Sequence, residues 1–247
     1  RRMLLTCKAL IEGGRLMGYD AAMQGDIAAN SSDTAERELA DAQAGFLTPI
    51  VKACLTEWGV ECTYNALQCF GGHGYIAEHG MEQLARDARI TTLYEGTTGI
   101  QALDLLGRKI VAMKGAGLKA FLARVQAFCE ENADNQSLAE FVGPLRETAS
   151  RWQQLTVKIG QRAAGDPDEI GAASYDYLMY SGYAVLAYWW ARAVAAADAS
   201  SHPQSFRDDK RATARFFFAR VLPRTLTHSA AIESGVAGLP ELAVEAV

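Results

Sequence analysis

Apolar residues recur every three or four positions along most of this chain, and this spacing constrains the fold more than any other feature. Such spacing places side chains on one face of an α-helix, whereas a half-buried β-strand alternates apolar and polar residues. The pattern is present from the start, where Met3, Cys7 and Leu10 share one face. It recurs in residues 118–128, 141–159, 178–193 and 206–222. The chain is therefore predicted to be all-α.

The second half of the chain is predicted to form an antiparallel four-helix bundle. Short polar connections near residues 132–136, 165–170 and 200–204 separate its four amphipathic runs. Helices joined in this way pack in alternating directions, and their apolar faces share one core. Pro223 should kink or end the last helix, because proline cannot donate a backbone hydrogen bond. Residues 235–247 are expected to be loosely held.

The first half is predicted to be a helical domain over residues 1–115 that begins inside a helix, with the appended bundle over residues 116–247. A polar stretch at 24–41 indicates a connection between two helices. Pro49 in the second helix marks either its first turn, with Thr48 as N-cap, or a kink. Further helices are expected at 81–89 and 98–113, and the glycine-containing stretch 114–117 marks the domain boundary.

Composition and charge exclude several classes of protein. The formal net charge of -5 argues against binding to nucleic acid, which requires clustered positive charge. The longest apolar stretches, such as 184–190 and 216–219, are too short to span a bilayer. The 5 cysteines are odd in number and form no CxxC or His-partnered pattern. We therefore expect no metal site, buried thiols in a reducing compartment and a cytoplasmic location.

The stretch 68–109 holds the residues best suited to chemistry. Gly71 and Gly72 have no Cβ, so a ligand backbone or a phosphate can approach the main chain there. Glu95 precedes a helix whose start is indicated by Thr98-x-x-Gln101, the spacing of a capping box. A carboxylate on a tight loop beside the free N–H groups of a helix start is suited to act as a general base.

Three motifs in this stretch together resemble the C-terminal signature of the acyl-CoA dehydrogenase family. They are Gln68-Cys69-Phe70-Gly71-Gly72, Arg86-Asp87-Ala88-Arg89-Ile90 and Tyr94-Glu95-Gly96-Thr97. The resemblance implies an FAD-dependent enzyme that converts an acyl-CoA thioester to its trans-2-enoyl-CoA. Glu95 then corresponds to the base that removes the α-proton while the β-hydrogen leaves as hydride to FAD. A carboxylate in this role has to be shielded from water in an apolar pocket.

The same resemblance implies roles for further residues. Gly96 corresponds to the residue against the substrate thioester, and Thr97 to a hydroxyl on the flavin nucleotide, with an N-cap role as the alternative. Gln68, Gly71 and Gly72 correspond to the turn that meets the FAD pyrophosphate across a subunit interface. This implies a homodimer or homotetramer. An electron-transferring flavoprotein is the implied electron acceptor.

Other polar residues in the stretch are interpreted structurally. Arg86 and Asp87 are expected to form a partly buried pair that fixes the Glu95 loop, with ligand binding as the alternative. His73 is expected to be structural or to face solvent. At Gly99 many members of the family carry Gln or Glu instead. A side-chain contact to the cofactor is therefore lost at this position.

The second half also bears a resemblance. Gly171-Ala172-Ala173-Ser174 and Thr213-Ala214-Arg215-Phe216 are similar to a subset of the family with an appended helical domain, which includes enzymes acting on 3-methylmercaptopropionyl-CoA. In the family, an N-terminal helical domain and a middle β-domain precede the region that this chain resembles. The chain is thus expected to be part of a longer polypeptide, and alone to bind FAD poorly and turn over nothing.

Two other functions are compatible with the sequence. An acyl-CoA oxidase would use the same base but let dioxygen reach the reduced flavin. A noncatalytic helical module for assembly or partner binding would need no base at all.

Overall fold

The computed structural model describes residues 1–239, and every regular element in that range is helical, which confirms the all-α prediction. The α-helices are α1 Arg2–Asn30, α2 Thr34–Phe70, α3 Met81–Ile90, α4 Thr98–Leu103, α5 Ala116–Glu131, α6 Ala139–Ala163, α7 Asp168–Asp198, α8 Gln204–Phe216 and α9 Arg224–Ser234. The 3-10 turns are η1 Gly71–Tyr75, η2 Ala77–His79 and η5 Val236–Gly238, and the π-helical segments are η3 Asp104–Ala112 and η4 Phe217–Val221.

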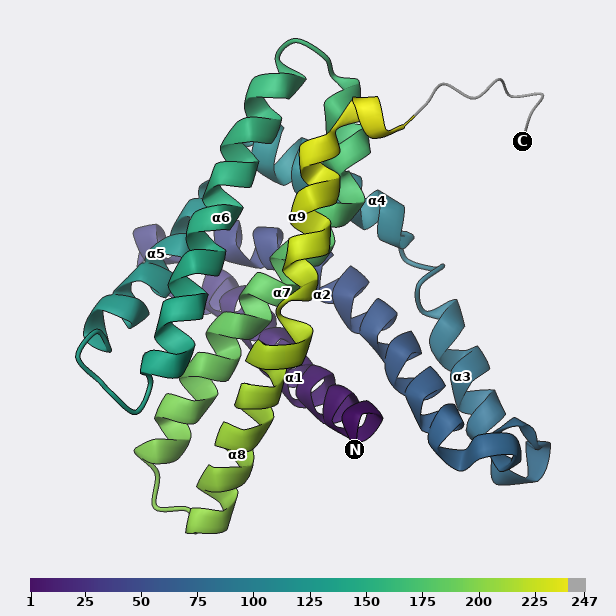
Figure 1. Ribbon diagram of the computed structural model, residues 1–247. Coiled ribbons are helices and arrows are strands. Elements are labelled where there is room, and N and C mark those ends of the chain that lie inside the picture. Colours follow the sequence, from purple (N-terminus) through teal and green to yellow (C-terminus); the bar gives the residue numbers. More distant parts are fainter. Residues whose placement is uncertain (240–247) are drawn as a thin grey trace, which may run out of the picture.

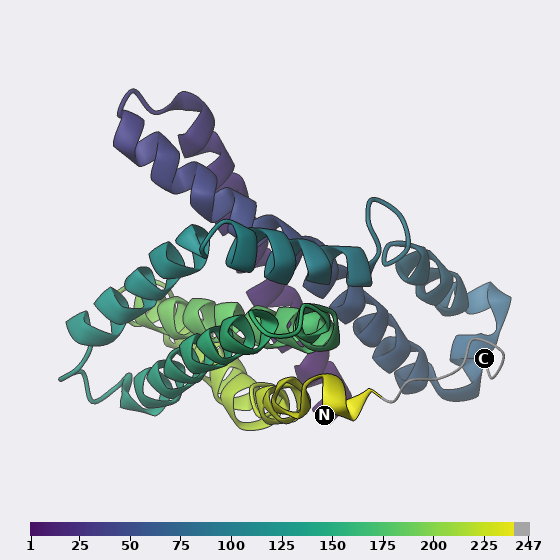
Figure 2. The same ribbon diagram turned by 90° about the horizontal axis from the view of Figure 1, so that it is seen from above.

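Helices α1 and α2 form a long hairpin whose tip projects from the rest of the molecule (Figure 2). The predicted connection between two helices forms within 24–41, but it is only residues 31–33, because α1 continues to Asn30 and α2 begins at Thr34. Most side chains at this tip are exposed, so their polarity reflects solvent and not a break in the helices. Asp33 caps α2, since its Oδ1 accepts hydrogen bonds from the backbone N–H groups of Ala35 and Glu36 at 2.8 and 3.4 Å.

Pro49 lies inside α2 and not in its first turn, so of the two alternatives the one with Thr48 as N-cap is excluded. The Thr48 hydroxyl instead donates to the carbonyl oxygen of Ala44 at 2.7 Å, one turn earlier in the same helix. Gly71 ends α2, as predicted. The predicted helix at 98–113 forms as α4 followed directly by η3, and the next helix, α5, already begins at Ala116.

Helix α7 is the centre of the core (Figure 1). Every residue from 177 to 188 is buried, and α7 contacts α1, α2, α4, α6, α8 and α9. The prediction that this run is amphipathic was therefore wrong, because a helix surrounded on all sides has no polar face. The other predicted runs form as α5, α6 and α8 with η4.

Helix α9 was not predicted. The preceding helix ends at Val221, just before Pro223, as predicted, and Pro223 then stands at the N-cap of α9. Helix α9 packs on α6 and α7. A fifth helix therefore packs on the four predicted runs, and their arrangement as an antiparallel four-helix bundle stays a prediction. The expectation of a loose end concerns residues 235–247, of which 240–247 lie outside the described part.

One hydrophobic core joins the two halves of the chain. The Phe46 ring of α2 lies 6.2 Å from that of Phe121 on α5 and 5.8 Å from that of Trp152 on α6, measured between ring centroids. The division at residues 115 and 116 stays a prediction, and any domains it separates share this core. Over residues 1–239, none of the helices combines the length and apolarity that crossing a membrane requires.

All 5 cysteines are free thiols. Cys54, Cys62 and Cys129 are buried and Cys7 is partly buried, as expected, but Cys69 is exposed. Within the described range no group of side chains is arranged to hold a metal ion.

Candidate functional site

The loop that carries Glu95 connects α3 to α4 and has an unusual backbone. Glu95 has φ 54° and Gly96 has φ 86°, so two consecutive residues lie in the left-handed region. This region is unfavourable for a residue with a Cβ and is tolerated where surrounding contacts impose it. Residues held in this way occur often at functional sites.

Side chains from α2 and α4 impose that conformation. Lys52 of α2 donates hydrogen bonds from Nζ to the carbonyl oxygens of Thr91, at 3.0 Å, and Gly96, at 2.7 Å. The Nε2 atom of Gln101 donates to the carbonyl oxygen of Glu95 at 3.1 Å. The Thr98 hydroxyl donates to Glu57 Oε1 of α2 at 2.5 Å. Hydrogen bonds to side chains of α2 and of α4 therefore hold the loop in place.

The predicted capping box does not form. Thr97 and not Thr98 is the N-cap residue of α4, and its side chain makes no capping hydrogen bond. Thr98 and Gln101 have the residue types of the motif, but their side chains bind Glu57 and the Glu95 carbonyl instead. The Thr98-x-x-Gln101 spacing therefore predicted the start of α4 to within one residue. It did not predict the partners of the two side chains.

Glu95, Thr97 and the neighbouring apolar side chains are exposed on this chain, and Gly96 is half-buried. Leu93 and Ile100, close to Glu95 in the sequence, are exposed to 53% and 58%, so these apolar side chains are open to solvent. Among residues 1–239 the Glu95 side chain has no hydrogen-bond or ion-pair partner. The shielding from water that the sequence analysis expected is therefore not supplied by this part of the protein.

The glycine turn at the end of α2 is open to ligands. Gln68, Gly71 and Gly72 are exposed, and a Cβ built on either glycine would meet no atom within 4 Å. Gly71 has φ 61°, so a residue without a Cβ is favoured there. His73 is exposed, as expected, and its ring stacks edge-on with His79 at 5.4 Å.

The glycine turn and the Glu95 loop lie at opposite ends of α3 (Figure 1). Helix α3 has 10 residues, so about 15 Å separates the two ends at 1.5 Å per residue. The sequence predicts that residues of the glycine turn and of the Glu95 loop belong to the functional site. One chain therefore presents them as two separate surfaces, with the α2–α3 face between them.

A groove of about 790 Å³ runs along this face between α2 and α3. Its apolar walls are Tyr64 and Leu67 of α2, Ile90 at the end of α3, and Leu93 in the loop that follows. Arg86, Asp87 and Arg89 supply its charged rim.

The predicted Arg86–Asp87 pair does not form in the described part of the chain. Both side chains are exposed, and neither takes part in an ion pair there. The expectation that they fix the Glu95 loop was therefore wrong. Lys52 and Glu57 have that role, and sequence reasoning missed them because they precede the loop by about forty residues and bear no motif of their own.

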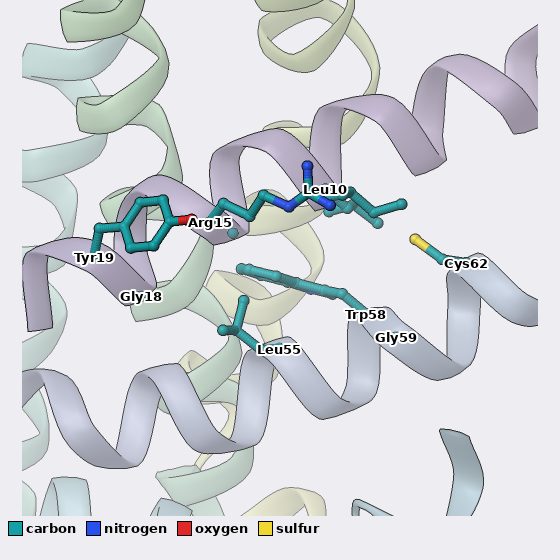
Figure 3. A pocket seen from close by; sticks show the side chains of 10 residues that line it. Leu10, Arg15, Gly18, Tyr19, Leu55, Trp58, Gly59 and Cys62 are labelled. Carbon is teal, nitrogen blue, oxygen red and sulfur yellow. The ribbon is translucent and has the colours of Figure 1, made fainter. Parts of the chain in front are cut away.

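A second, mostly apolar cavity of about 430 Å³ lies between α1 and α2 (Figure 3). Gly14 and Gly18 of α1 and Gly59 of α2 line it and have no side chain to fill it, and Trp58 extends from α2 toward α1. It contains no residue that the sequence predicted for the site.

Comparison with known families accounts for almost the whole chain. The family described as "Acyl-CoA dehydrogenase, C-terminal domain" matches residues 1–111. The family described as "Acetyl-CoA dehydrogenase C-terminal like" matches residues 121–243. The two matches fall on either side of the glycine-containing stretch 114–117.

Individual relatives agree. The 3-methylmercaptopropionyl-CoA dehydrogenase of Ruegeria pomeroyi is 36% identical over 246 residues, which cover 95% of this chain and 41% of the relative. The broad-specificity linear acyl-CoA dehydrogenase FadE5 of Mycobacterium tuberculosis is 33% identical over 247 residues, covering 95% of this chain and 40% of the relative. The chain thus spans about two fifths of the length of these relatives.

A solved structure shares the fold. The crystal structure of Caenorhabditis elegans ACDH-11 in complex with C11-CoA aligns with a TM-score of 0.65 at 24% sequence identity. The alignment covers 85% of this chain and 34% of that chain. The chain therefore belongs to the acyl-CoA dehydrogenase family and corresponds to its C-terminal helical region.

Proposed function

We propose that this chain is the C-terminal part of an FAD-dependent acyl-CoA dehydrogenase, in which Glu95 removes the α-proton of an acyl-CoA thioester. The observation that carries the proposal is the Glu95 loop itself. Two consecutive left-handed residues, held by contacts from α2 and α4, present a carboxylate that has no partner of its own among residues 1–239. A general base has to be available in this way, because a carboxylate already engaged in an ion pair accepts a proton poorly.

The chain supplies part of the environment that such a base needs. Removing a proton next to a thioester is difficult, so the carboxylate has to leave water and enter an apolar site. Leu93, Tyr94 and Ile100 supply one apolar side of that site. The rest is assigned to the remainder of a longer polypeptide, consistent with the two-fifths share of its relatives that the chain spans. Gly96 is proposed to lie against the thioester.

The residues present fit an FAD molecule shared between subunits. The open main chain of Gly71 and Gly72, with Gln68 beside it, would contact the pyrophosphate, and Thr97 would contact the nucleotide. The glycine turn and the Glu95 loop flank α3, which is about 15 Å long, and we assign each to a different FAD, as in a homodimer or homotetramer. When bound, FAD supplies the hydride acceptor, and an electron-transferring flavoprotein is the proposed electron acceptor.

Replacing Glu95 tests the proposal. In the full-length protein we expect Glu95→Gln to slow bleaching of the flavin by acyl-CoA about 100- to 10,000-fold, the range for loss of a general base, while FAD content is unchanged. Glu147→Gln is the matched control, because Glu147 is exposed on α6, remote from the loop. Bleaching by Glu95→Gln at the wild-type rate would refute the role of Glu95.

Oxygen sensitivity separates the dehydrogenase from an oxidase. After anaerobic reduction by acyl-CoA, the reduced flavin of a dehydrogenase should reoxidise slowly in air-saturated buffer. Rapid reoxidation in a stopped-flow experiment would favour the acyl-CoA oxidase. The absence of any acyl-CoA-dependent bleaching in the full-length protein would favour a noncatalytic helical module.

A further inference from the structure

We infer that Lys52 is a positioning residue of the proposed reaction, which fixes the Glu95 carboxylate by closing its loop. This inference rests on the proposed function of Glu95. Lys52 lies at the middle of α2, and it precedes Glu95 by 43 positions along the chain. Its position brings the ammonium group to the two ends of the loop and not to the carboxylate.

The Lys52 ammonium bridges the loop through main-chain atoms. Its two acceptors are the carbonyl oxygens of Thr91 and Gly96, at 3.0 and 2.7 Å. Thr91 follows α3 directly and Gly96 follows Glu95, so the two acceptors enclose residues 92–95. Hydrogen bonds from a charged donor are stronger than neutral ones. Since both acceptors are backbone atoms, the bridge fixes the path of the loop whatever side chains it carries.

The backbone of Glu95 needs such a constraint. At φ 54° the Cβ of Glu95 is crowded against its own main chain, and an unrestrained loop would relax to negative φ. Relaxation would rotate the carboxylate away from its present direction. The Gln101 side chain holds the Glu95 carbonyl from α4, and Lys52 holds the next carbonyl, that of Gly96, from α2.

The part of α2 that carries Lys52 is packed tightly into the core. Ala53 and Cys54, the residues next to Lys52, are fully buried in the core, and Trp58 is buried one turn beyond Cys54. Glu57, on the same helix, accepts the Thr98 hydroxyl at 2.5 Å and so fixes the start of α4 as well. The loop is thereby held at a fixed distance from the packed part of α2. The ammonium is directed at carbonyl groups and not at Glu57, so an intrahelical ion pair does not account for its placement.

The test compares variants of the full-length holoenzyme. Lys52→Met keeps most of the apolar stem and removes the donor, Lys52→Arg restores a charged donor, and Lys119→Met is the control on an exposed lysine of α5. Lys52→Gln, which retains an amide donor too short to reach both carbonyls, serves if Lys52→Met does not fold. Two readouts are needed: amide hydrogen exchange of residues 91–98, and steady-state kinetics with FAD content measured for each variant.

For Lys52→Met we expect at least tenfold faster exchange in residues 91–98, with exchange in α6 unchanged. We expect kcat to fall about 10- to 100-fold, the effect of misplacing a reacting group by about 1 Å, while KM and FAD content stay within about twofold. Lys52→Arg should recover part of the lost kcat. In the Glu95→Gln background, Lys52→Met should lower kcat no further, because the two residues act through one proton transfer.

The outcomes separate the two hypotheses. If Glu95→Gln is inactive while Lys52→Met exchanges and turns over like the wild type, the positioning role is refuted and the proposed function stands. If Glu95→Gln is fully active, the proposed function fails, whatever Lys52 does to hydrogen exchange. Equal losses of kcat and FAD content in Lys52→Met would also refute the positioning role, because a general defect in folding would then explain them.

Discussion

Gly182 of α7 packs directly against Cys54 and Trp58 of α2, so Gly182→Ala tests the packing of the two halves. A Cβ at this position would lie 2.3 Å from Cys54 Sγ and 3.2 Å from Trp58 Cζ2. Ordinary contacts between such atoms are about 3.5–4.0 Å, so the first is too short by about 1 Å or more. Cys54 is fully buried and Trp58 is 3% exposed, so neither has free space into which to move. The helices themselves would have to separate.

The expected loss of stability follows from two opposing effects. Inserting a methyl group into a well-packed core costs about 1–3 kcal/mol, and the severity of this contact favours the upper end. Alanine in a helix is favoured over glycine by about 1 kcal/mol, which offsets part of that cost. A net loss of about 2 kcal/mol remains. For a protein of this size it corresponds to a fall in Tm of about 4–8 °C.

Thermal unfolding followed by circular dichroism at the helix band measures this change. Gly171→Ala is the matched control, because Gly171 lies on the same helix, is exposed and has no atom within 4 Å of a built Cβ. That variant should be as stable as the wild type or slightly more stable. In the double variant Cys54→Ala and Gly182→Ala, removal of the sulfur should make the combined loss smaller than the sum of the single losses. A rise in Tm for Gly182→Ala equal to that for Gly171→Ala would refute the close packing of α2 and α7.

Two further predictions concern titratable groups. Burial raises the pKa of the Cys62 thiol to about 12 and also raises the pKa of the Cys54 thiol, so both stay protonated at pH 8. Mass spectrometry after brief treatment with iodoacetamide should therefore find the label on exposed Cys69 first, and early labelling of Cys54 would contradict the structure. Burial acts to raise the pKa of Glu12, but hydrogen bonds from Lys210 and Lys8 outweigh it and hold the pKa below its ordinary 4.5. The stabilisation from Glu12 is present above that ordinary pKa and is lost as pH falls through the lowered folded-state pKa, so Glu12→Gln should lose less Tm than the wild type between about pH 5 and pH 3. Parallel Tm curves for the two proteins over that range would exclude this role for Glu12.

Local chemistry in the sequence determined the helical class, most helix positions and the motifs of the site. The helical spacing of apolar residues identified α5, α6 and α8, and Gly71 was identified correctly as the end of α2. These features depend on residues within one or two helical turns of each other, which is the range over which periodicity and capping operate. The motif around Glu95 belongs to the same class, since its residues are adjacent in the chain.

Tertiary structure decided what local chemistry could not. The polar tip of the α1–α2 hairpin looked like a loop because exposed helix and loop have similar compositions. Helix α7 looked amphipathic, but partners on every side bury it. The loop of Glu95 is held by Lys52 and Glu57, which no spacing rule connects to it, and not by the adjacent Arg86 and Asp87. Contacts between residues about forty positions apart arise only when α2 and α3 pack together. The sequence therefore shows which residue types are present, but only the tertiary structure shows which residues they contact.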